Sequence, residues 1–385
     1  MYKIAKLNKI SPVGLARLTD DYEITENVNE ADGILVRSAD MLTIEFSPFL
    51  KAVARAGAGV NNIPLDRCAE EGIVVFNTPG ANANAVKELA ICALLLASRD
   101  VFGGMKWVET IKGEGDAVPK LVEKGKSAFA GVELAGKTIG VIGLGAIGVM
   151  VANAAKSLGM KVLGYDPYIS VDAAWSLSRS IVHVNNMNEI FANADYITVH
   201  IPLNDKTKHT INANNIALMK DGVRIINFSR NELVENAAII EGLKNGKVAK
   251  YVTDFPSADL IGVENIVCIP HLGASTEESE ENCAVMAACE IRDYLENGNI
   301  KNSVNFPNCQ VDRESPVRLC IMHKNIPNMI SQFSTLLAED NINIDNLINK
   351  SKGDYAYTII DIATDHATIV DELVAIEGVI KVRKI

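Results

Sequence analysis

Short runs rich in Val and Ile recur along the chain, bounded by Gly, Asn, Asp or Pro, at residues 33–37, 72–78, 138–143, 161–165, 195–201, 223–228, 250–254 and 265–270. Helix-like segments of ten or more residues lie between several of these runs. Apolar strands that alternate with helices are typical of parallel sheets covered by helices on both faces. The pattern therefore predicts a doubly wound α/β protein, although it does not indicate the order of the strands.

Differences in pattern divide the 385 residues into domains. A chain of this length exceeds the roughly 250–300 residues at which single cores stop growing, so more than one domain is expected. Residues 1–95 end in a long apolar helix, after which glycines interrupt the pattern, at Gly103, Gly104, Gly113 and Gly115. A second domain is predicted at residues 96–275 and a last one at residues 309–385. Between them, residues 276–308 are predicted to return the chain to the first domain and to contain a polar, proline-bearing linker.

The tail after the linker has a regular order of expected elements. It predicts strand 317–322, helix 327–339, strand 342–349, strand 355–362, helix 368–376 and strand 379–385. A β-α-β-β-α-β order is typical of the ferredoxin-like fold. We therefore expect a compact ferredoxin-like domain at the end of the chain.

Charge and cysteine content exclude several classes of function. The formal net charge of −11 repels phosphate backbones and anionic lipid, so neither nucleic acid nor a membrane is an expected partner. The N-terminal residues carry three lysines and do not resemble a signal peptide. Residues 138–155 lack charge, but their glycines predict a buried strand, turn and helix instead of a membrane span. The seven cysteines form no C-x-x-C pair, which predicts reduced thiols in a cytoplasmic protein and no metal site.

A glycine motif follows one of the apolar strands. Gly143, Gly145 and Gly148 have the spacing G-x-G-x-x-G, and a helix is expected to begin there. The first glycine permits a tight turn, the second lets the backbone approach a pyrophosphate, and the third lets the helix meet the strand. The N–H groups at the start of the helix, near Ala146 and Ile147, can donate to phosphates. The motif in this context predicts a dinucleotide site.

An aspartate follows the next expected strand. Asp166 stands eighteen positions after Gly148, close to the spacing of about 20 residues expected for a carboxylate that binds the ribose. A carboxylate at this place accepts hydrogen bonds from the ribose 2′-hydroxyl and repels a 2′-phosphate. The sequence therefore predicts NAD as the cofactor in preference to NADP.

Several motifs together resemble the D-2-hydroxyacid dehydrogenases, and within them the phosphoglycerate dehydrogenases. The matching segments are residues 55–62, 77–80, 141–148, 200–203, 227–230 and 270–276. Their occurrence in one order along essentially the whole chain makes a chance resemblance improbable. The resemblance implies a Rossmann-type NAD domain inserted in a flavodoxin-like α/β substrate domain, with a helix after residue 276 that returns to the substrate domain.

The resemblance assigns catalytic roles to two residues. Oxidation of a 2-hydroxy acid moves a hydride from C2 to the nicotinamide while a base removes the hydroxyl proton. His271 would be that base, since imidazole titrates near the working pH. Arg230 would hold the substrate carboxylate with its planar guanidinium and polarise the C2 oxygen.

The acid that orients the histidine departs from the family pattern. The family places a glutamate five residues after an aspartate, whereas the fifth position after Asp254 is here Asp259. The first possibility is that Asp259 replaces the glutamate, with one methylene less reach. The second is that the segment carries a deletion and that Asp254 itself serves.

Other site residues are also implied by the resemblance. The glycine-rich turn at Ala56 and Gly57 would bind the substrate carboxylate through backbone N–H groups. The cationic candidates for a substrate phosphate are Arg55, Arg37 and Lys87, and Arg55 is preferred because it stands beside the turn. Further expected contacts with the cofactor are made by Thr78, His200, Pro202, Thr207, Phe228, Ser229, Asp254 and Gly273.

The tail resembles the amino-acid-sensing ACT domain appended to phosphoglycerate dehydrogenases. In that domain a histidine and two asparagines bind serine, and the matching residues are His323, Asn325 and Asn343. The family usually has glycine after the proline at position 327, where this chain has Asn328. Asparagine tolerates positive φ better than most residues, so the turn can form. Serine is the expected effector, and a dimerisation module without ligand is the alternative.

The combined expectation is an NAD-dependent enzyme that oxidises 3-phosphoglycerate to 3-phosphohydroxypyruvate, the first step of phosphorylated serine biosynthesis. One alternative is a reductase of another small 2-oxo acid, such as glyoxylate or hydroxypyruvate. A second is an NAD-sensing, corepressor-like interaction protein, which the presence of His271 and Arg230 disfavours. The resemblance also implies a homodimer or a homotetramer.

Overall fold

A computed structural model describes all residues from 1 to 385. The chain forms two compact units. The outer unit contains Met1–Asn82 and Glu277–Ile385, and the inserted unit is the continuous stretch Ala83–Thr276. Helix α3 (Ala83–Ser98) contains residue 95, at which the first domain was predicted to end, and its buried residues pack in one apolar cluster with strands of the inserted unit.

The outer unit is built on a parallel sheet with the strand order β2-β1-β3-β4-β5. This 2-1-3-4-5 order is flavodoxin-like and confirms the predicted fold of the substrate domain. Helix α11 packs against three of these strands and contacts α1, and its first turn holds Glu277, Glu278 and Glu280 at the positive end of the helix dipole. The elements are β1 (Tyr2–Lys6), α1 (Pro12–Leu15), β2 (Tyr22–Thr25), η1 (Val28–Glu30), β3 (Gly33–Val36), β4 (Ala52–Arg55), α2 (Leu65–Glu70), β5 (Val74–Phe76) and α11 (Glu277–Asn297).

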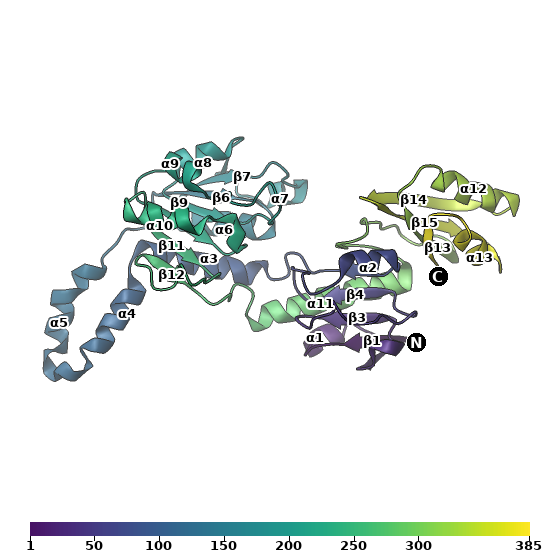
Figure 1. Ribbon diagram of the computed structural model, residues 1–385, viewed down its shortest axis with the longest axis horizontal. Coiled ribbons are helices and arrows are strands. Elements are labelled where there is room, and N and C mark those ends of the chain that lie inside the picture. Colours follow the sequence, from purple (N-terminus) through teal and green to yellow (C-terminus); the bar gives the residue numbers. More distant parts are fainter. The chain divides into compact units, whose positions relative to one another are not determined.

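The inserted unit has a seven-stranded parallel sheet of order β12-β11-β10-β9-β6-β7-β8. Numbered from its first strand, the order contains the 3-2-1-4-5-6 arrangement of a Rossmann fold, as predicted. Helices cover the sheet, among them α3 and α6 (Figure 1). The elements are β6 (Thr138–Ile142), α6 (Ala146–Ser157), β7 (Lys161–Tyr165), α7 (Val171–Ser176), β8 (Val182–His183), α8 (Met187–Asn193), β9 (Tyr196–Val199), α9 (Ala213–Leu218), β10 (Val223–Asn227), η4 (Asn231–Leu233), α10 (Asn236–Lys244), β11 (Val248–Thr253) and β12 (Ile266–Cys268).

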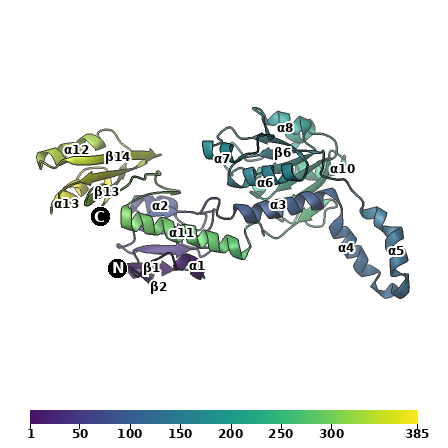
Figure 2. The same ribbon diagram turned by 180° about the vertical axis from the view of Figure 1, so that it is seen from behind.

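A helical arm projects from the inserted unit in both views (Figures 1 and 2). It consists of α4 (Val101–Thr110), η2 (Lys112–Ala117), α5 (Val118–Gly125) and η3 (Lys126–Phe129). Gly103 and Gly104 were expected to interrupt the pattern, but both lie inside α4. The Asp100 side chain caps this helix by accepting from the N–H of Gly103, and a Cβ at that glycine would lie 2.1 Å from Asp100 Oδ2. The expected break occurs later, at Gly115, where φ is 49°.

The C-terminal domain of the outer unit, residues 317–384, has the predicted ferredoxin-like order of elements. Its four-stranded antiparallel sheet is ordered β14-β15-β13-β16. Asn328 precedes its first helix with φ of 73°, as the tolerance of asparagine for positive φ predicted. The elements are β13 (Val317–Lys324), α12 (Met329–Glu339), β14 (Ile344–Lys352), β15 (Tyr355–Ile362), α13 (Ile369–Val374) and β16 (Val379–Lys384).

Side chains of this sheet bind the carbonyl groups at and just after the end of α11. Arg383 donates to the carbonyls of Tyr294 and Leu295, and Tyr357 donates to that of Gly298 at 2.7 Å. Arg318, fully buried in a salt bridge with Asp361, donates to the carbonyl of Asn297. Basic side chains suit this end of a helix because its last carbonyls lack partners and carry partial negative charge. The C-terminal domain is thereby fixed within the outer unit.

No helix in the structure has both the length and the apolar content needed to span a membrane. All seven cysteines are free thiols, and four are buried. Burial raises the pKa of Cys68 and of Cys309 to about 12. Thiols with such a pKa stay protonated at neutral pH and are poor nucleophiles, so these two are structural.

Candidate active site

The glycine turn between β6 and α6 is closely packed on one side and open on the other. A Cβ at Gly143, where φ is 92°, would lie 2.4 Å from the carbonyl oxygen of His200. A Cβ at Gly148 would lie 1.9 Å from the carbonyl oxygen of Gly143. A Cβ at Gly145, in contrast, would meet no atom within 4 Å. The fold itself therefore requires the first and third glycines, and the exposed second glycine leaves room for a ligand.

The start of α6 and the side chain of Asp166 meet at this turn. Gly145 is the N-cap residue of α6 and provides no side-chain oxygen, so the N–H groups of Ala146 and Ile147 have no capping acceptor. Asp166 Oδ2 accepts from the N–H of Leu144 at 2.9 Å. Each carboxylate oxygen has a second lone pair, so Asp166 can hold the turn and still accept from a ribose hydroxyl.

His200 follows β9 and lies against the same turn through its carbonyl. Its Nε2 atom is 2.9 Å from Thr198 Oγ1, and burial lowers the pKa of His200 to about 4. The ring is therefore neutral at physiological pH. In the loop that follows, the Thr207 hydroxyl donates to the carbonyl of Pro202 at 2.6 Å and closes the loop on itself.

The turn after β10 is organised by one fully buried amide. Asn227 donates to the carbonyl of Arg230 and accepts from the N–H of Ser229. Ser229 also donates its hydroxyl to the carbonyl of Val199. Phe228 is buried, whereas the Arg230 side chain is exposed. The turn thus presents a guanidinium group from a rigid backbone.

His271 and Asp254 lie together at the ends of neighbouring strands. Asp254 follows β11, His271 follows β12, and the His271 N–H donates to the Asp254 carbonyl at 3.1 Å. The exposed imidazole packs edge-on against Phe255, with ring centroids 4.9 Å apart. Asp254 is 1% exposed and its Oδ1 atom has no hydrogen-bond partner.

The electrostatics of Asp254 connect it with both predicted catalytic residues. Burial raises the pKa of the Asp254 carboxyl, while the charges of His271 and Arg230 and a backbone N–H from Gly273 act in the opposite direction. A carboxylate in such a place gains from a positive neighbour because few other groups compensate its charge. The three ionisable groups therefore form one cluster.

Asp259 has a different environment. Its side chain is exposed and accepts from Asn236 Nδ2 at 3.0 Å. Hydrogen bonds from Ser257 and Asn236 lower the pKa of Asp259, and His271 has no part in that shift. Of the two aspartates left open by the sequence, the structure thus brings Asp254 and not Asp259 into electrostatic contact with His271.

All these groups follow the carboxyl ends of parallel strands in one sheet. The glycine turn follows β6, Asp166 follows β7, and His200 follows β9. Arg230, Asp254 and His271 come after β10, β11 and β12. Because the carboxyl ends of parallel strands meet at the same edge, these groups lie along one edge of the sheet, the edge at which doubly wound folds generally bind their ligands.

The predicted substrate turn belongs to the outer unit. Arg55, at the end of β4, donates to the carbonyls of Arg37 and Gly59, so its guanidinium supports the turn that contains Ala56 and Gly57. The carbonyl of Gly57 accepts from the N–H of Thr78. The other two cationic candidates form ion pairs, Arg37 with Glu280 and Lys87 with Glu88.

The predicted effector residues are engaged inside the C-terminal domain. His323 is 2% exposed, with Nε2 against Thr358 Oγ1 and Nδ1 against the carbonyl of Lys324. Asn325 donates to the carbonyl of Gly353, and Asn343 donates to Asp345. Each of these side chains thus has a hydrogen-bond partner elsewhere in its own domain, and their role in binding serine stays a prediction.

Sequence reasoning missed two residues of the site. Phe255 contacts the His271 ring, and its only signal was its place directly after Asp254. The hydroxyl of Thr198, on β9 and two residues before His200 in the chain, forms a hydrogen bond with the His200 ring. In a strand, residues i and i+2 lie on the same face, so this pairing could have been inferred from the spacing.

Comparison with known proteins agrees with this architecture. The NAD-binding domain of the D-isomer-specific 2-hydroxyacid dehydrogenases matches residues 91–273. D-3-phosphoglycerate dehydrogenase of Methanocaldococcus jannaschii is 37% identical over 311 residues, which cover 78% of this chain and 57% of the relative. This chain therefore spans a little over half the length of that relative.

Two further proteins match over more of their own length. D-3-phosphoglycerate dehydrogenase 1 of Saccharomyces cerevisiae is 30% identical over 377 residues, covering 91% of this chain and 76% of the relative. A crystal structure of NAD⁺-bound 3-phosphoglycerate dehydrogenase from Entamoeba histolytica is 27% identical, with a TM-score of 0.61, and the match covers 79% of this chain and 98% of that one. The chain accordingly belongs to the D-isomer-specific 2-hydroxyacid dehydrogenase family, and its inserted unit contains the family's NAD-binding domain.

Proposed function

We propose that the protein oxidises 3-phosphoglycerate to 3-phosphohydroxypyruvate with NAD as the hydride acceptor. The observation that carries this proposal is the cluster of His271, Asp254 and Arg230 at the same sheet edge as the glycine turn. A neighbouring base, acid and guanidinium are what oxidation of a 2-hydroxy acid needs from the protein. The substrate rests on the relatives named D-3-phosphoglycerate dehydrogenase.

In the proposed mechanism, the cofactor supplies only the hydride acceptor. The glycine turn and the open start of α6 bind its pyrophosphate, and Asp166 binds the adenosine ribose. Arg230 binds the substrate carboxylate and stabilises negative charge on the C2 oxygen. His271 Nε2 or Nδ1 accepts the hydroxyl proton, and the reverse reaction returns it from the same atom.

Asp254 is the proposed positioning residue for His271. Its buried carboxylate stabilises the imidazolium that forms when His271 takes the proton, and the backbone bond between the two residues fixes their separation. The ring of Phe255 packs against the imidazole with centroids 4.9 Å apart and is the proposed second support for its orientation. Asp259 has no proposed part in this step because Asn236 and Ser257 hold it in another hydrogen-bond network.

The substrate is tested by NADH oxidation with 3-phosphohydroxypyruvate, hydroxypyruvate, glyoxylate, pyruvate and 2-oxoglutarate. We expect kcat/KM for the phosphorylated acid to exceed that for hydroxypyruvate by at least about tenfold, since one charged hydrogen bond contributes about 1.5–3 kcal/mol. A higher kcat/KM for hydroxypyruvate or glyoxylate would favour the alternative reductase. Absence of turnover with every acid would favour an NAD-sensing interaction protein.

The cofactor preference is tested by Asp166→Asn. The amide oxygen can still accept from the Leu144 N–H, while the negative charge that repels a 2′-phosphate is gone. We expect KM for NADH to rise about tenfold and the ratio of kcat/KM for NADPH to that for NADH to rise by at least as much. Asp172→Asn, on the exposed start of α7, is the matched control and should change neither value. An unchanged ratio in Asp166→Asn would show that another residue selects NAD.

We also propose a homodimer or homotetramer that acts in the cytoplasm. Helix α4 carries four exposed apolar side chains, Val101, Phe102, Met105 and Val108. A surface helix with such a face is typical of a subunit interface. Sedimentation equilibrium of the full chain measures the number of subunits. The free thiols support a reducing compartment.

A further inference from the structure

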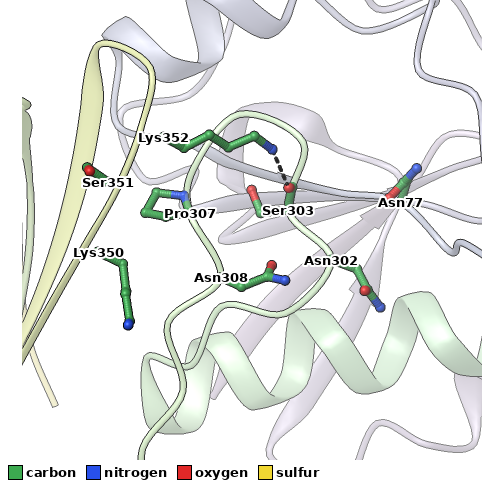
Figure 3. Close-up of a pocket in the computed structure, with 8 residues that line it drawn as sticks. All are labelled: Asn77, Asn302, Ser303, Pro307, Asn308, Lys350, Ser351 and Lys352. Atoms are coloured by element: carbon green, nitrogen blue, oxygen red, sulfur yellow. Dashed lines mark hydrogen bonds between the residues drawn. The ribbon is translucent and has the colours of Figure 1, made fainter. Parts of the chain in front are cut away.

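A cavity of about 400 Å³ that opens widely to solvent lies within the outer unit, between the segment 302–308 and strand β14 of the C-terminal domain (Figure 3). Its volume is within the range of about 300–1,000 Å³ typical of sites for small molecules. The lining residues are Asn77, Asn302, Ser303, Pro307, Asn308, Lys350, Ser351 and Lys352. None of them belongs to the dehydrogenase site described above.

The charge of this cavity is opposite to that of the chain. Its lining contains two lysines and no carboxylate, although the chain as a whole has a net charge of −11. Lys350 and Lys352 are two positions apart on β14, which places them on the same face of the strand. The side chain of Asn308 adds an amide to the polar lining. Ammonium and amide N–H donors together are the chemistry that binds an oxyanion.

The ammonium group of Lys352 retains a donor for a ligand. It donates to the carbonyls of Ser303 and Val304, each at 3.0 Å, and Figure 3 shows it reaching from β14 to the segment that carries Ser303. An ammonium has three N–H groups, so one is left. Partial burial lowers the pKa of Lys352, and the two carbonyls do not neutralise its charge. An anion in the cavity would supply the missing counter-charge.

The same segment supports the predicted substrate turn. Val304 donates its N–H to the carbonyl of Val75 on β5, and Asn77 donates its N–H to the carbonyl of Asn302. The Asn77 side chain then donates to the carbonyl of Ala58 at 2.6 Å, inside the turn. Hydrogen bonds joined by short stretches of backbone therefore connect Lys352 with the turn that would bind the substrate carboxylate.

We propose that this cavity binds a small oxyanion of the phosphate class, and that its occupation changes the affinity of the turn at residues 56–59 for the acid substrate. The ligand bridges Lys350 and Lys352 on β14 and the amide of Asn308. Because Lys352 also holds the segment 303–304, an anion bound to its remaining N–H weakens the two bonds to that segment by sharing the charge of the ammonium. The binding half of this proposal is independent of the reaction, and the coupling half rests on the proposed function.

Isothermal titration calorimetry of the full chain with inorganic phosphate, at constant ionic strength, tests the binding half. We expect one phosphate site in the outer unit that becomes about tenfold weaker in Lys350→Gln and in Lys352→Gln, since each loses a charged donor. Lys384→Gln, an exposed lysine of the same sheet paired with Asp365, is the control and should bind as the wild type does. Glycerol 2-phosphate, titrated in parallel, distinguishes free phosphate from a phosphate ester as the better ligand.

Two results would overturn the binding half. One is the absence of phosphate binding to the wild type. The other is binding that persists undiminished in both lysine variants, which would assign it to the proposed substrate site. Circular dichroism melting checks that the variants fold. If Lys352→Gln does not fold, the result for Lys350→Gln decides the test alone, because the Lys350 side chain makes no hydrogen bond to the segment 302–308. L-serine is titrated as a further ligand. Its affinity should be the same in Lys350→Gln as in the wild type, because the residues expected to bind it are His323, Asn325 and Asn343.

Steady-state kinetics test the coupling half. Phosphate is expected to change KM for 3-phosphohydroxypyruvate by at least about threefold with KM for NADH unchanged, and Lys350→Gln should abolish this effect. Inhibition that survives in Lys350→Gln would mean direct competition at the substrate turn and would overturn the coupling. If no acid is turned over, the proposed function fails, while the calorimetric result still decides whether the cavity binds phosphate.

Discussion

Substitution of His271 by alanine is expected to lower kcat by roughly 10²–10⁴-fold, the range contributed by a positioned general base. The proton of the C2 hydroxyl would then have no acceptor on the protein at the moment of hydride transfer. The dissociation constant for NADH should stay within about twofold, because the glycine turn and Asp166 are untouched. Stopped-flow measurement of NADH binding together with steady-state kinetics separates the two quantities.

The stability of the variant serves as the control. The His271 side chain is exposed, and besides its charge interaction with Asp254 it packs against the ring of Phe255, so its removal should change the free energy of unfolding by about 1 kcal/mol or less. A loss of activity that accompanied a large fall in melting temperature would indicate unfolding instead. Turnover within about tenfold of the wild type would remove His271 from the mechanism.

The second large effect is expected from Asp254→Asn, with kcat lowered by roughly 10²–10⁴-fold, as when a carboxylate that orients a catalytic histidine becomes an amide. The amide keeps the shape of the side chain but cannot stabilise the imidazolium. The pH profile of the reductive reaction should also change, because the Asp254 carboxyl, whose pKa is raised by burial, no longer titrates beside the histidine. Initial rates from pH 5 to pH 9 measure both changes.

Asp259→Asn is the matched control for this experiment. It makes the same chemical change five residues away, on an exposed side chain that bonds Asn236. We expect its kcat within about twofold of the wild type and an unchanged pH profile. If Asp259→Asn proved the more damaging of the two, Asp259 would be the partner of His271. A reduced rate in Asp254→Asn with an unshifted pH profile would leave Asp254 only a structural role.

Much of the fold follows from local patterns. Runs of Val and Ile located most strands of the inserted unit, and β7 (Lys161–Tyr165) and β15 (Tyr355–Ile362) occur at the predicted residues. The missed strands have weaker patterns. β4 (Ala52–Arg55) is half alanine, which has little preference for strands, and β1 (Tyr2–Lys6) carries two lysines because only part of it is buried. Pairing with neighbouring strands, which the sequence does not display locally, is what makes these segments strands.

The candidate site was predictable to the extent that it depends on strand ends. Arg230, Asp254 and His271 each follow a strand, and parallel strands bring their carboxyl ends to one edge. The choice between Asp254 and Asp259 was not predictable, because it depends on the path of the loop after β11 and on the bond to Asn236. The burial of His323 was likewise hidden, since it results from packing against Phe333 and β15.

The insertion of one unit within the other has a consequence for the order of folding. The inserted unit is a continuous stretch, Ala83–Thr276, so a ribosome completes all of it before the last part of the outer unit emerges. The flavodoxin-like sheet, in contrast, lacks the cover of α11 until residues beyond Glu277 are made. Contacts between such distant segments form late because the intervening loop must first close. During synthesis the first 82 residues therefore expose an apolar sheet face until α11 has been made. This exposed face makes them prone to aggregation and to binding by chaperones.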